Sequence, residues 1–390
     1  MSEPIVIVGA GLAGYNLARE LRKLNAEVPL VVISRDSAGF YSKPMLSNAL
    51  AGKKTAATLV MKSAEKMAEE LKAQVLPLTA VTGVDSASRT LTLSNGQSLV
   101  YRDLVLAQGA DTIRIPLQGD AADTVLSVND LDDFARFAQA LDQGPCGAEV
   151  KRVVILGAGL IGCEFANDLQ ARQVQATVVD LADRALGRLL PPEASALLQA
   201  KLEAGGAAFQ FGAGAQAVDK VGGALRVTLS DGSTVAADLV VSAVGLKPRT
   251  DLAQLAGAAV GRGVQVNRLL ATSVPHVHAL GDCAEVEGLV LPYVMPLMAQ
   301  ARALAATLNG TPTAVAYPAM PVTVKTPAWP TVVCPPPAGA QGDWQVTQDA
   351  ESLQALFVNP AQPDAPLGFA LQGKAVAQRQ ALAGKIAPWL

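Results

Sequence analysis

Two sets of three glycines are the residues whose types and spacing point most directly to chemistry. In a Gly-x-Gly-x-x-Gly motif the first glycine permits a tight turn and the second lets the backbone approach a pyrophosphate. The third lets a helix pack closely on a sheet, and the pyrophosphate binds at that helix's N-terminus, where free N–H groups favour negative charge. Two such sets predict two dinucleotide sites: Gly9, Gly11, Gly14, Gly157, Gly159 and Gly162.

Each glycine set stands between a predicted strand and a predicted helix, as the motif requires. Uninterrupted apolar runs at 5–8 and 153–156 are typical of strands buried on both faces. Helical spacing of apolar residues follows at 15–24 and 163–172. One copy alone could be a glycine-rich turn in another kind of α/β domain, but two complete copies strongly favour dinucleotide binding.

An acidic residue about 20 positions after the third glycine usually binds a ribose hydroxyl. After the first set the stretch LVVISRD ends in Asp36, preceded by Ser34 and Arg35, and after the second ATVVD ends in Asp180. Asp36 comes one or two residues later than this rule favours, and either aspartate could instead cap its turn. Asp180 predicts a second dinucleotide without a 2'-phosphate, which is NADH.

Length and composition favour a compact protein of two or three domains. The chain has 390 residues, of which 50% are hydrophobic and 17% charged, and its net charge of -3 argues against a general nucleic-acid binder. We find no signal-peptide pattern and no apolar run of about 18 residues that could span a membrane. These features predict a cytoplasmic protein.

The cysteines and histidines give no sign of a redox pair or a metal site. Neither a Cys-x-x-Cys pair nor a cluster of metal ligands is present, so we expect no metal and expect each cysteine to be a small buried residue. The only histidines are His276 and His278, and the four cysteines are Cys146, Cys163, Cys283 and Cys334.

A second internal repeat relates the two halves of the chain. Residues 91–110 and 227–246 each read as a strand, an Asn-Gly or Asp-Gly turn, a second strand, an acidic residue and an apolar strand ending in glycine. Residues 276–286 then predict a buried strand that leads into Gly281 and Asp282, ahead of a helix at 295–310.

On these motifs the chain resembles the glutathione-reductase-like flavoprotein reductases, which bind FAD first and NAD(P)H second. The resemblance covers roughly residues 3–312, with Gln108 where the family commonly has threonine. It implies an α/β fold of two Rossmann-like dinucleotide-binding domains plus a small α+β C-terminal domain. The implied division is 1–112 and 241–312 for the FAD domain, 113–240 for the NADH domain and 313–390 for the C-terminal domain.

The segment 41–50 lacks the cysteine that the thiol-dependent branches carry there, which is typical of reductases that pass electrons singly to small iron proteins. Residues 41–47 and 320–337 resemble the rubredoxin reductases. This implies a monomer that moves hydride from NADH to flavin N5, then single electrons to the iron of rubredoxin, for example for alkane hydroxylation. A ferredoxin-type carrier, and an NADH oxidase or quinone reductase activity, remain alternatives.

The C-terminal domain begins after a change of composition at 308–318, where Gly, Pro and Thr mark a boundary. Five short strands and a small helix are expected beyond it. Trp329 is either a surface aromatic for partner docking or a packing residue. Because rubredoxins are acidic, we expect a basic patch near the flavin, formed by Lys43, Lys53 and Lys54.

The resemblance also implies roles for single residues. Glu164, placed in the first helical turn behind the second glycine set, would approach the nicotinamide and pair with Lys43 beside flavin N5, with Lys325 near the ring. Alternatively, Glu164 is only a residue at the start of a helix, and Lys43 and Lys325 are exposed lysines on loops. The residues implied for FAD are Gly9, Gly11, Leu12, Ala13, Gly14, Ser34, Arg35, Asp36, Lys43, Val81, Gly109, Asp282, Val294 and Lys325. Those implied for NADH are Gly157, Gly159, Ile161, Gly162, Glu164, Asp180 and Gly245.

Overall fold

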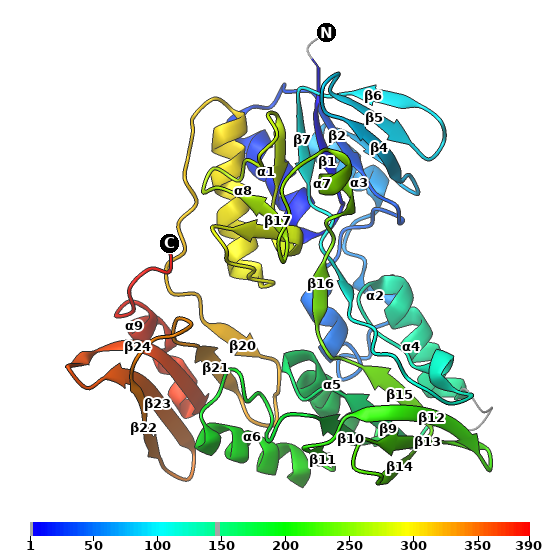
Figure 1. Ribbon diagram of the computed structural model, residues 1–390, viewed down its shortest axis with the longest axis vertical. Helices are drawn as coiled ribbons and strands as arrows, with labels where there is room; N and C mark the ends of the chain where they lie inside the picture. Colours follow the sequence, from blue (N-terminus) through cyan, green and yellow to red (C-terminus); the bar gives the residue numbers. More distant parts are fainter. Residues whose placement is uncertain (1–2, 145–148) are drawn as a thin grey trace.

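The computed structural model describes residues 3–144 and 149–390 (Figure 1). Two parallel sheets, each covered by helices, are followed by an antiparallel sheet near the end of the chain. The predicted α/β class is therefore confirmed. Among the described residues, no helix combines the length and the apolar character needed to cross a membrane.

The first parallel sheet has the strand order β18-β7-β1-β2-β3. Its strands are β1 (Ile5–Val8), β2 (Leu30–Ile33), β3 (Gln74–Leu76), β7 (Asp103–Leu106) and β18 (Val277–Ala279). The accompanying helices are α1 (Leu12–Leu24), α3 (Ala64–Leu71), α7 (Asp251–Leu255) and α8 (Val294–Leu308). Because β18 comes from a late part of the chain, residues far apart in sequence complete one sheet.

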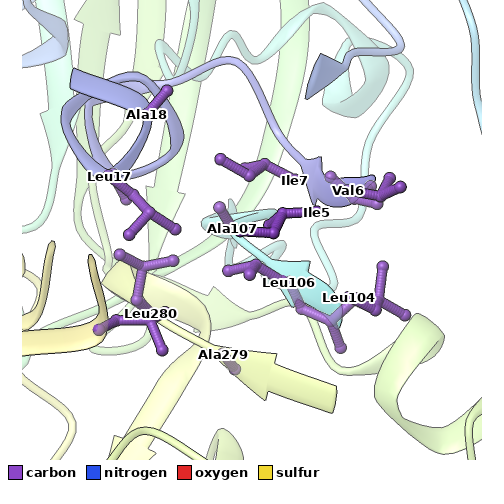
Figure 2. Close-up of a cluster of buried hydrophobic side chains, with 14 of the residues drawn as sticks. Ile5, Val6, Ile7, Leu17, Ala18, Leu104, Leu106, Ala107, Ala279 and Leu280 are labelled. Atoms are coloured by element: carbon purple, nitrogen blue, oxygen red, sulfur yellow. The ribbon is translucent and has the colours of Figure 1, made fainter. Parts of the chain in front are cut away.

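Strand β1 is fully buried, as its uninterrupted apolar sequence predicts. Ile5 and Ile7 share a core with Leu17 of α1, Leu106 of β7 and Leu280 just after β18, and Figure 2 shows part of this cluster. Helices α1 and α8 pack against each other beside the sheet (Figure 1). The core therefore fixes the start of α1 relative to the turn after β18.

The second parallel sheet has the order β11-β10-β9-β15. Strand β15 spans the boundary expected between residues 240 and 241, so we place the end of this domain after Ser242. The strands are β9 (Arg152–Leu156), β10 (Gln175–Asp180), β11 (Ala208–Phe211) and β15 (Leu239–Ser242), with helices α4 (Leu131–Gln143), α5 (Leu160–Gln170) and α6 (Pro192–Ala204).

The hairpins predicted from the second internal repeat are confirmed as parts of two three-stranded antiparallel sheets. The first consists of β4 (Val81–Asp85), β5 (Thr90–Leu93) and β6 (Ser98–Val100), and the second of β12 (Ala215–Val221), β13 (Ala224–Leu229) and β14 (Thr234–Ala237). The chain crosses between the two domains on one antiparallel pair, β8 (Ala110–Thr112) with β16 (Leu246–Pro248).

Short elements complete the two domains. They are the 3-10 helices η1 (Lys43–Asn48), η2 (Ala122–Thr124) and η3 (Gly281–Cys283), the helix α2 (Ala56–Leu59), and the parallel pair β17 (Val264–Val266) with β19 (Ala284–Val286).

The C-terminal sheet is antiparallel, in the order β20-β21-β24-β23-β22. One face joins the core of the second domain, and buried Gln372 donates from Nε2 to the carbonyl of Ala194 at 2.8 Å. Its elements are β20 (Val322–Val324), β21 (Thr331–Cys334), β22 (Asp343–Gln348), β23 (Ser352–Asn359), β24 (Gln362–Gly373), η4 (Lys374–Gln378) and α9 (Arg379–Ala383). These match the five strands and small helix expected from the sequence.

Trp329 belongs to this interface. The Lys201 ammonium lies 4.5 Å from the centre of the Trp329 ring, and the ring packs against the shared core. Of the two alternatives from the sequence, the structure favours packing. Cys163, Cys283 and Cys334 are buried as predicted, whereas Cys146 lies outside the described residues.

The second and third glycines of the first set, Gly11 and Gly14, differ in the space around them. This difference can be tested through the stability of the protein. A Cβ on Gly14 would lie 1.9 Å from the carbonyl oxygen of Gly9, whereas nothing lies within 4 Å of a Cβ on Gly11. We predict that Gly14→Ala lowers the free energy of unfolding by about 1–3 kcal/mol, as overpacking does, and that Gly11→Ala leaves it unchanged. Thermal unfolding followed by circular dichroism measures both, and equal melting temperatures for the two variants would contradict the prediction.

Candidate functional site

Both glycine turns leave an open space in front of a helix N-terminus. A Cβ on Gly9 would lie 2.2 Å from the Ala107 carbonyl oxygen, so the first turn is packed tightly from behind. In front, nothing lies within 4 Å of a Cβ on Gly11 or on Gly159. Neither α1 nor α5 has a side-chain N-cap. The free N–H groups and the open space together fit a pyrophosphate at each turn.

Asp180 lies against the second turn. Its Oδ2 accepts a hydrogen bond from the Ala158 N–H at 2.5 Å, and its Oδ1 accepts one from the Ala182 N–H at 2.8 Å. The carboxylate is therefore fixed at the end of β10, beside the glycine turn. This is the place from which an acidic side chain reaches a ribose hydroxyl.

At the first turn, the position equivalent to Asp180 is occupied by Ser34. The Gly9 N–H donates to the carbonyl of Ile33 at 2.8 Å, just as the Gly157 N–H donates to Val179 at 2.8 Å, so the residue that follows is equivalent in the two domains. Asp36 lies behind Ser34, accepting from its Oγ at 2.6 Å and from the Ala38 N–H at 2.8 Å. Asp36 thus caps the turn and holds the Ser34 hydroxyl.

Lys43 of η1 and Asp282 of η3 attract each other electrostatically. Burial lowers the pKa of Lys43 and raises the pKa of Asp282, while the attraction between the two groups opposes both shifts. The Arg249 guanidinium also lowers the pKa of Lys43. Among the described residues, neither side chain has a hydrogen-bond partner, so both have capacity left for a ligand's polar groups.

Glu164 is held by residues from two other parts of the chain, η1 and the C-terminal domain. It is 2% exposed, and the backbone N–H of Lys325 in the C-terminal domain donates to its Oε1 at 2.9 Å. The Lys325 ammonium forms a salt bridge with its Oε2, and the Ser47 hydroxyl of η1 donates to the same atom. A buried carboxylate needs such partners, because desolvation otherwise disfavours its charge.

Two expectations about Glu164 are wrong. Glu164 is the fifth residue of α5 and so begins the second turn, not the first. Its cationic partner is Lys325, not Lys43, whereas Lys43 is attracted electrostatically to Asp282. The reason is that the C-terminal domain packs onto α5. This packing brings Lys325, the residue that follows β20, into contact with the Glu164 carboxylate.

The next turn of α5 also forms hydrogen bonds with the first domain and with the C-terminal domain. Asp168, four residues after Glu164, accepts from the N–H groups of Leu50 and Ala51, each at 2.8 Å. Burial raises the pKa of Asp168, and these two N–H groups oppose the rise. Asn167 accepts from the Ala328 N–H of the C-terminal domain at 3.1 Å. Helix α5 therefore joins all three parts.

The structure places the remaining predicted residues on several elements. Leu12 and Ala13 begin α1, and Val81 begins β4. Arg35 is exposed and lies 3.8 Å from Asp111. Gly109 and Gly245 have φ values of +71° and +123°, and Ile161 and Val294 are 41% exposed near the starts of α5 and α8.

Sequence reasoning missed three residues of the site. Ser47 belongs to the segment 41–50, which lacks the cysteine of the thiol-dependent branches, and nothing in the sequence pattern points to its hydroxyl. Asp168 could have been found, because residues four apart share a helix face and Glu164 was already a candidate. Gln300 of α8, whose Oε1 accepts from the Gly281 N–H at 2.6 Å, follows no recognisable pattern.

Comparison with known proteins identifies related families and chains. Residues 3–306 match the model of the pyridine nucleotide-disulphide oxidoreductases, and residues 314–386 match the rubredoxin binding C-terminal domain. The chain is 47% identical to rubredoxin-NAD(+) reductase from Alcanivorax borkumensis over 380 residues, covering 97% of each chain. It is 46% identical to rubredoxin-NAD(+) reductase from Acinetobacter baylyi, covering 99% of this chain and 98% of the relative.

A solved structure shares the whole architecture. The ferredoxin reductase for the CYP199A2 system from Rhodopseudomonas palustris superposes with a TM-score of 0.88 at 27% identity, covering 99% of this chain and 96% of that one. The C-terminal sheet is therefore part of a shared architecture of three domains.

The three-way contact at Glu164 can be tested through stability. We predict that Lys325→Met lowers the free energy of unfolding by about 3 kcal/mol, the lower end for a broken buried pair, because Ser47 and a backbone N–H still donate to the carboxylate. Adding Glu164→Gln removes the uncompensated charge and should restore about 1 kcal/mol or more. Urea unfolding of the single and double variants measures this, and a double variant no more stable than Lys325→Met would contradict it.

Proposed function

The chain belongs to the pyridine nucleotide-disulphide oxidoreductase family, and on that premise we propose that it transfers electrons from NADH through a bound FAD to rubredoxin. The observation that carries the proposal is the C-terminal domain. Residues 314–386 match a rubredoxin binding domain, and Lys325 of that domain reaches the buried Glu164 beside the second glycine turn.

FAD and NADH each have a fitting site. FAD binds at the first turn, where Gly11 leaves space for the pyrophosphate and Ser34 lies at the ribose position. NADH binds at the second turn, with Gly159 at the pyrophosphate and Asp180 at the ribose. When bound, FAD accepts a hydride from NADH and gives up its electrons one at a time, which is chemistry that the protein supports but does not supply.

The charged side chains have separate tasks in this proposal. Lys43 supplies a positive charge that stabilises negative charge on the reduced ring, and Asp282 binds the ribityl part of FAD. Glu164 orients the nicotinamide, and Lys325 and Ser47 keep its carboxylate in place. The N-terminus of α8 at Val294 would add a further partial positive charge for the flavin ring.

No protein thiol in the described part of the chain is suited to take the electrons. Burial raises the pKa of Cys163 to about 12, and the pKa values of Cys283 and Cys334 to about 11. The thiolate is the reactive form, so these groups stay inert near neutral pH. In this proposal the electrons leave directly for an external carrier, and the three described cysteines take no part.

Two finer points belong to the same proposal. The protein works in the cytoplasm, where NADH is regenerated. The rubredoxin that it reduces passes its electrons to an oxygenase, for example one that hydroxylates alkanes.

Stopped-flow spectroscopy tests the function. The purified holoenzyme is reduced anaerobically with NADH and mixed with oxidised rubredoxin or, separately, with oxidised ferredoxin. We expect rapid reoxidation by rubredoxin and slow reoxidation by ferredoxin. Faster transfer to ferredoxin would assign a ferredoxin-type acceptor instead, and reoxidation by oxygen or a quinone alone would favour the oxidase or quinone reductase alternative.

Asp180 gives a prediction about the nucleotide. Its carboxylate repels a 2'-phosphate, so kcat/KM for NADH should exceed that for NADPH by more than about tenfold, or about 1.4 kcal/mol. Asp180→Ala should reduce this preference, measured by initial rates with each nucleotide. Asp183→Ala is the matched control, because Asp183 is an exposed aspartate three residues further on. Equal use of both nucleotides by the unmodified enzyme would rule out this role for Asp180.

The exposed loop after η1 gives a prediction about the acceptor. Lys53 and Lys54 have no ion-pair partner in the described part of the chain and extend from the segment held by Asp168. Rubredoxin reduction should slow as salt rises from about 10 to 200 mM, because the Debye length falls from about 30 Å to below about 10 Å. Replacing both lysines with glutamine should weaken this dependence, whereas Lys220→Gln, on β12, should not. A rate of rubredoxin reduction that does not change with salt would contradict electrostatic steering of the acceptor.

A further inference from the structure

Gln300 connects the turn after β18 to the segment that leads into the C-terminal domain. Its side chain is 3% exposed, its Oε1 accepts from the Gly281 N–H at 2.6 Å, and its Nε2 donates to the Tyr317 hydroxyl at 2.7 Å. Tyr317 is fully buried. Both ends of the amide are therefore committed, and a flipped amide would set its NH2 group against the Gly281 N–H.

The turn that Gln300 holds has little freedom. Gly281 has a φ of +79°, and a Cβ on it would lie 2.7 Å from the Cβ of Ala13 in α1. The turn thus lies directly on the start of the helix behind the first glycine set. Asp282 follows immediately, so the direction of its carboxylate depends on how Gly281 is held.

Tyr317, near the start of the C-terminal domain, pairs through its backbone with the last two residues of the chain. The Trp389 N–H donates to the Tyr317 carbonyl at 2.6 Å, and the Tyr317 N–H donates to the carbonyl of Leu390 at 3.1 Å. Trp389 contacts both the core of the first domain and the core beneath α9. Burial raises the pKa of Tyr317, so its hydroxyl stays protonated and neutral.

We propose that Gln300 and Tyr317 are positioning residues for FAD: they hold the Gly281–Asp282 turn in the conformation that presents Asp282 to the cofactor. The inference rests on the proposed binding of FAD at the first turn. Tyr317 sets the orientation of the Gln300 amide, and the amide oxygen then takes the one backbone N–H that fixes the turn. Because Tyr317 pairs with Trp389 and Leu390, the C-terminal domain contributes to the retention of FAD.

Dissociation of FAD from the holoenzyme tests the proposal, measured on serial dilution by the rise in flavin fluorescence. Gln300→Met leaves the Gly281 N–H without an acceptor, and we expect FAD to bind about tenfold more weakly or worse. Tyr317→Phe keeps the acceptor but frees the amide to rotate, so its expected loss is smaller, about threefold. Gln300→Glu keeps an acceptor for Gly281 and lets the Tyr317 hydroxyl donate instead, which should restore FAD affinity to within about threefold of the unmodified protein.

Thr307→Val is the matched control. Thr307 also lies on α8, and its Oγ1 accepts from the Thr313 N–H of the same connecting segment at 3.0 Å, but it does not bond to Gly281. We expect this variant to bind FAD as tightly as the unmodified protein. Unchanged affinity in Gln300→Met, or an equal loss in Thr307→Val, would overturn the positioning role. An unmodified protein that binds no FAD would instead overturn the proposed function on which this role depends.

Discussion

The arrangement of the domains depends on the contacts that the buried Glu164 carboxylate makes with Ser47 and Lys325. A charged group with 2% of its surface exposed is stable only when partners replace its lost hydration. Those partners come from η1 of the first domain and from the C-terminal domain, whereas Glu164 itself belongs to the second. No two of the three parts can satisfy the carboxylate fully, so their docking is coupled through it.

The same packing gives Lys325 and Lys43 different acidic partners. Lys325 neutralises the buried Glu164 through a salt bridge. Lys43 is instead attracted electrostatically to Asp282, and it lies on the segment that Asp168 holds through Leu50 and Ala51. The packing of the C-terminal domain on α5 thus determines which lysine pairs with Glu164.

The sequence predicts what depends on local backbone geometry. Both glycine turns, the buried strands before them and the hairpins were predictable, because tight turns and alternating patterns restrict residue type within a few positions. Residues brought together by packing were not. Glu164 and Lys325 lie 161 positions apart, and no spacing rule connects them. The spacing rule for the ribose-binding residue looks for a carboxylate, so it selects Asp36 and misses Ser34. The register of the first sheet instead places the Ser34 hydroxyl at the ribose position.

The C-terminal domain is therefore part of the site, and not only a platform for the acceptor. Its lysine neutralises the glutamate assigned to the nicotinamide, and the Ala328 N–H bonds to Asn167 one turn further along α5. Its last segment pairs with Tyr317, which bonds to Gln300 and through it to the turn before Asp282. The domain thus contacts both dinucleotide sites through buried polar groups. Such groups tolerate little displacement, because each lost partner leaves a buried charge or donor unsatisfied. The domain that matches a rubredoxin binding module is consequently held in a fixed position relative to both glycine turns.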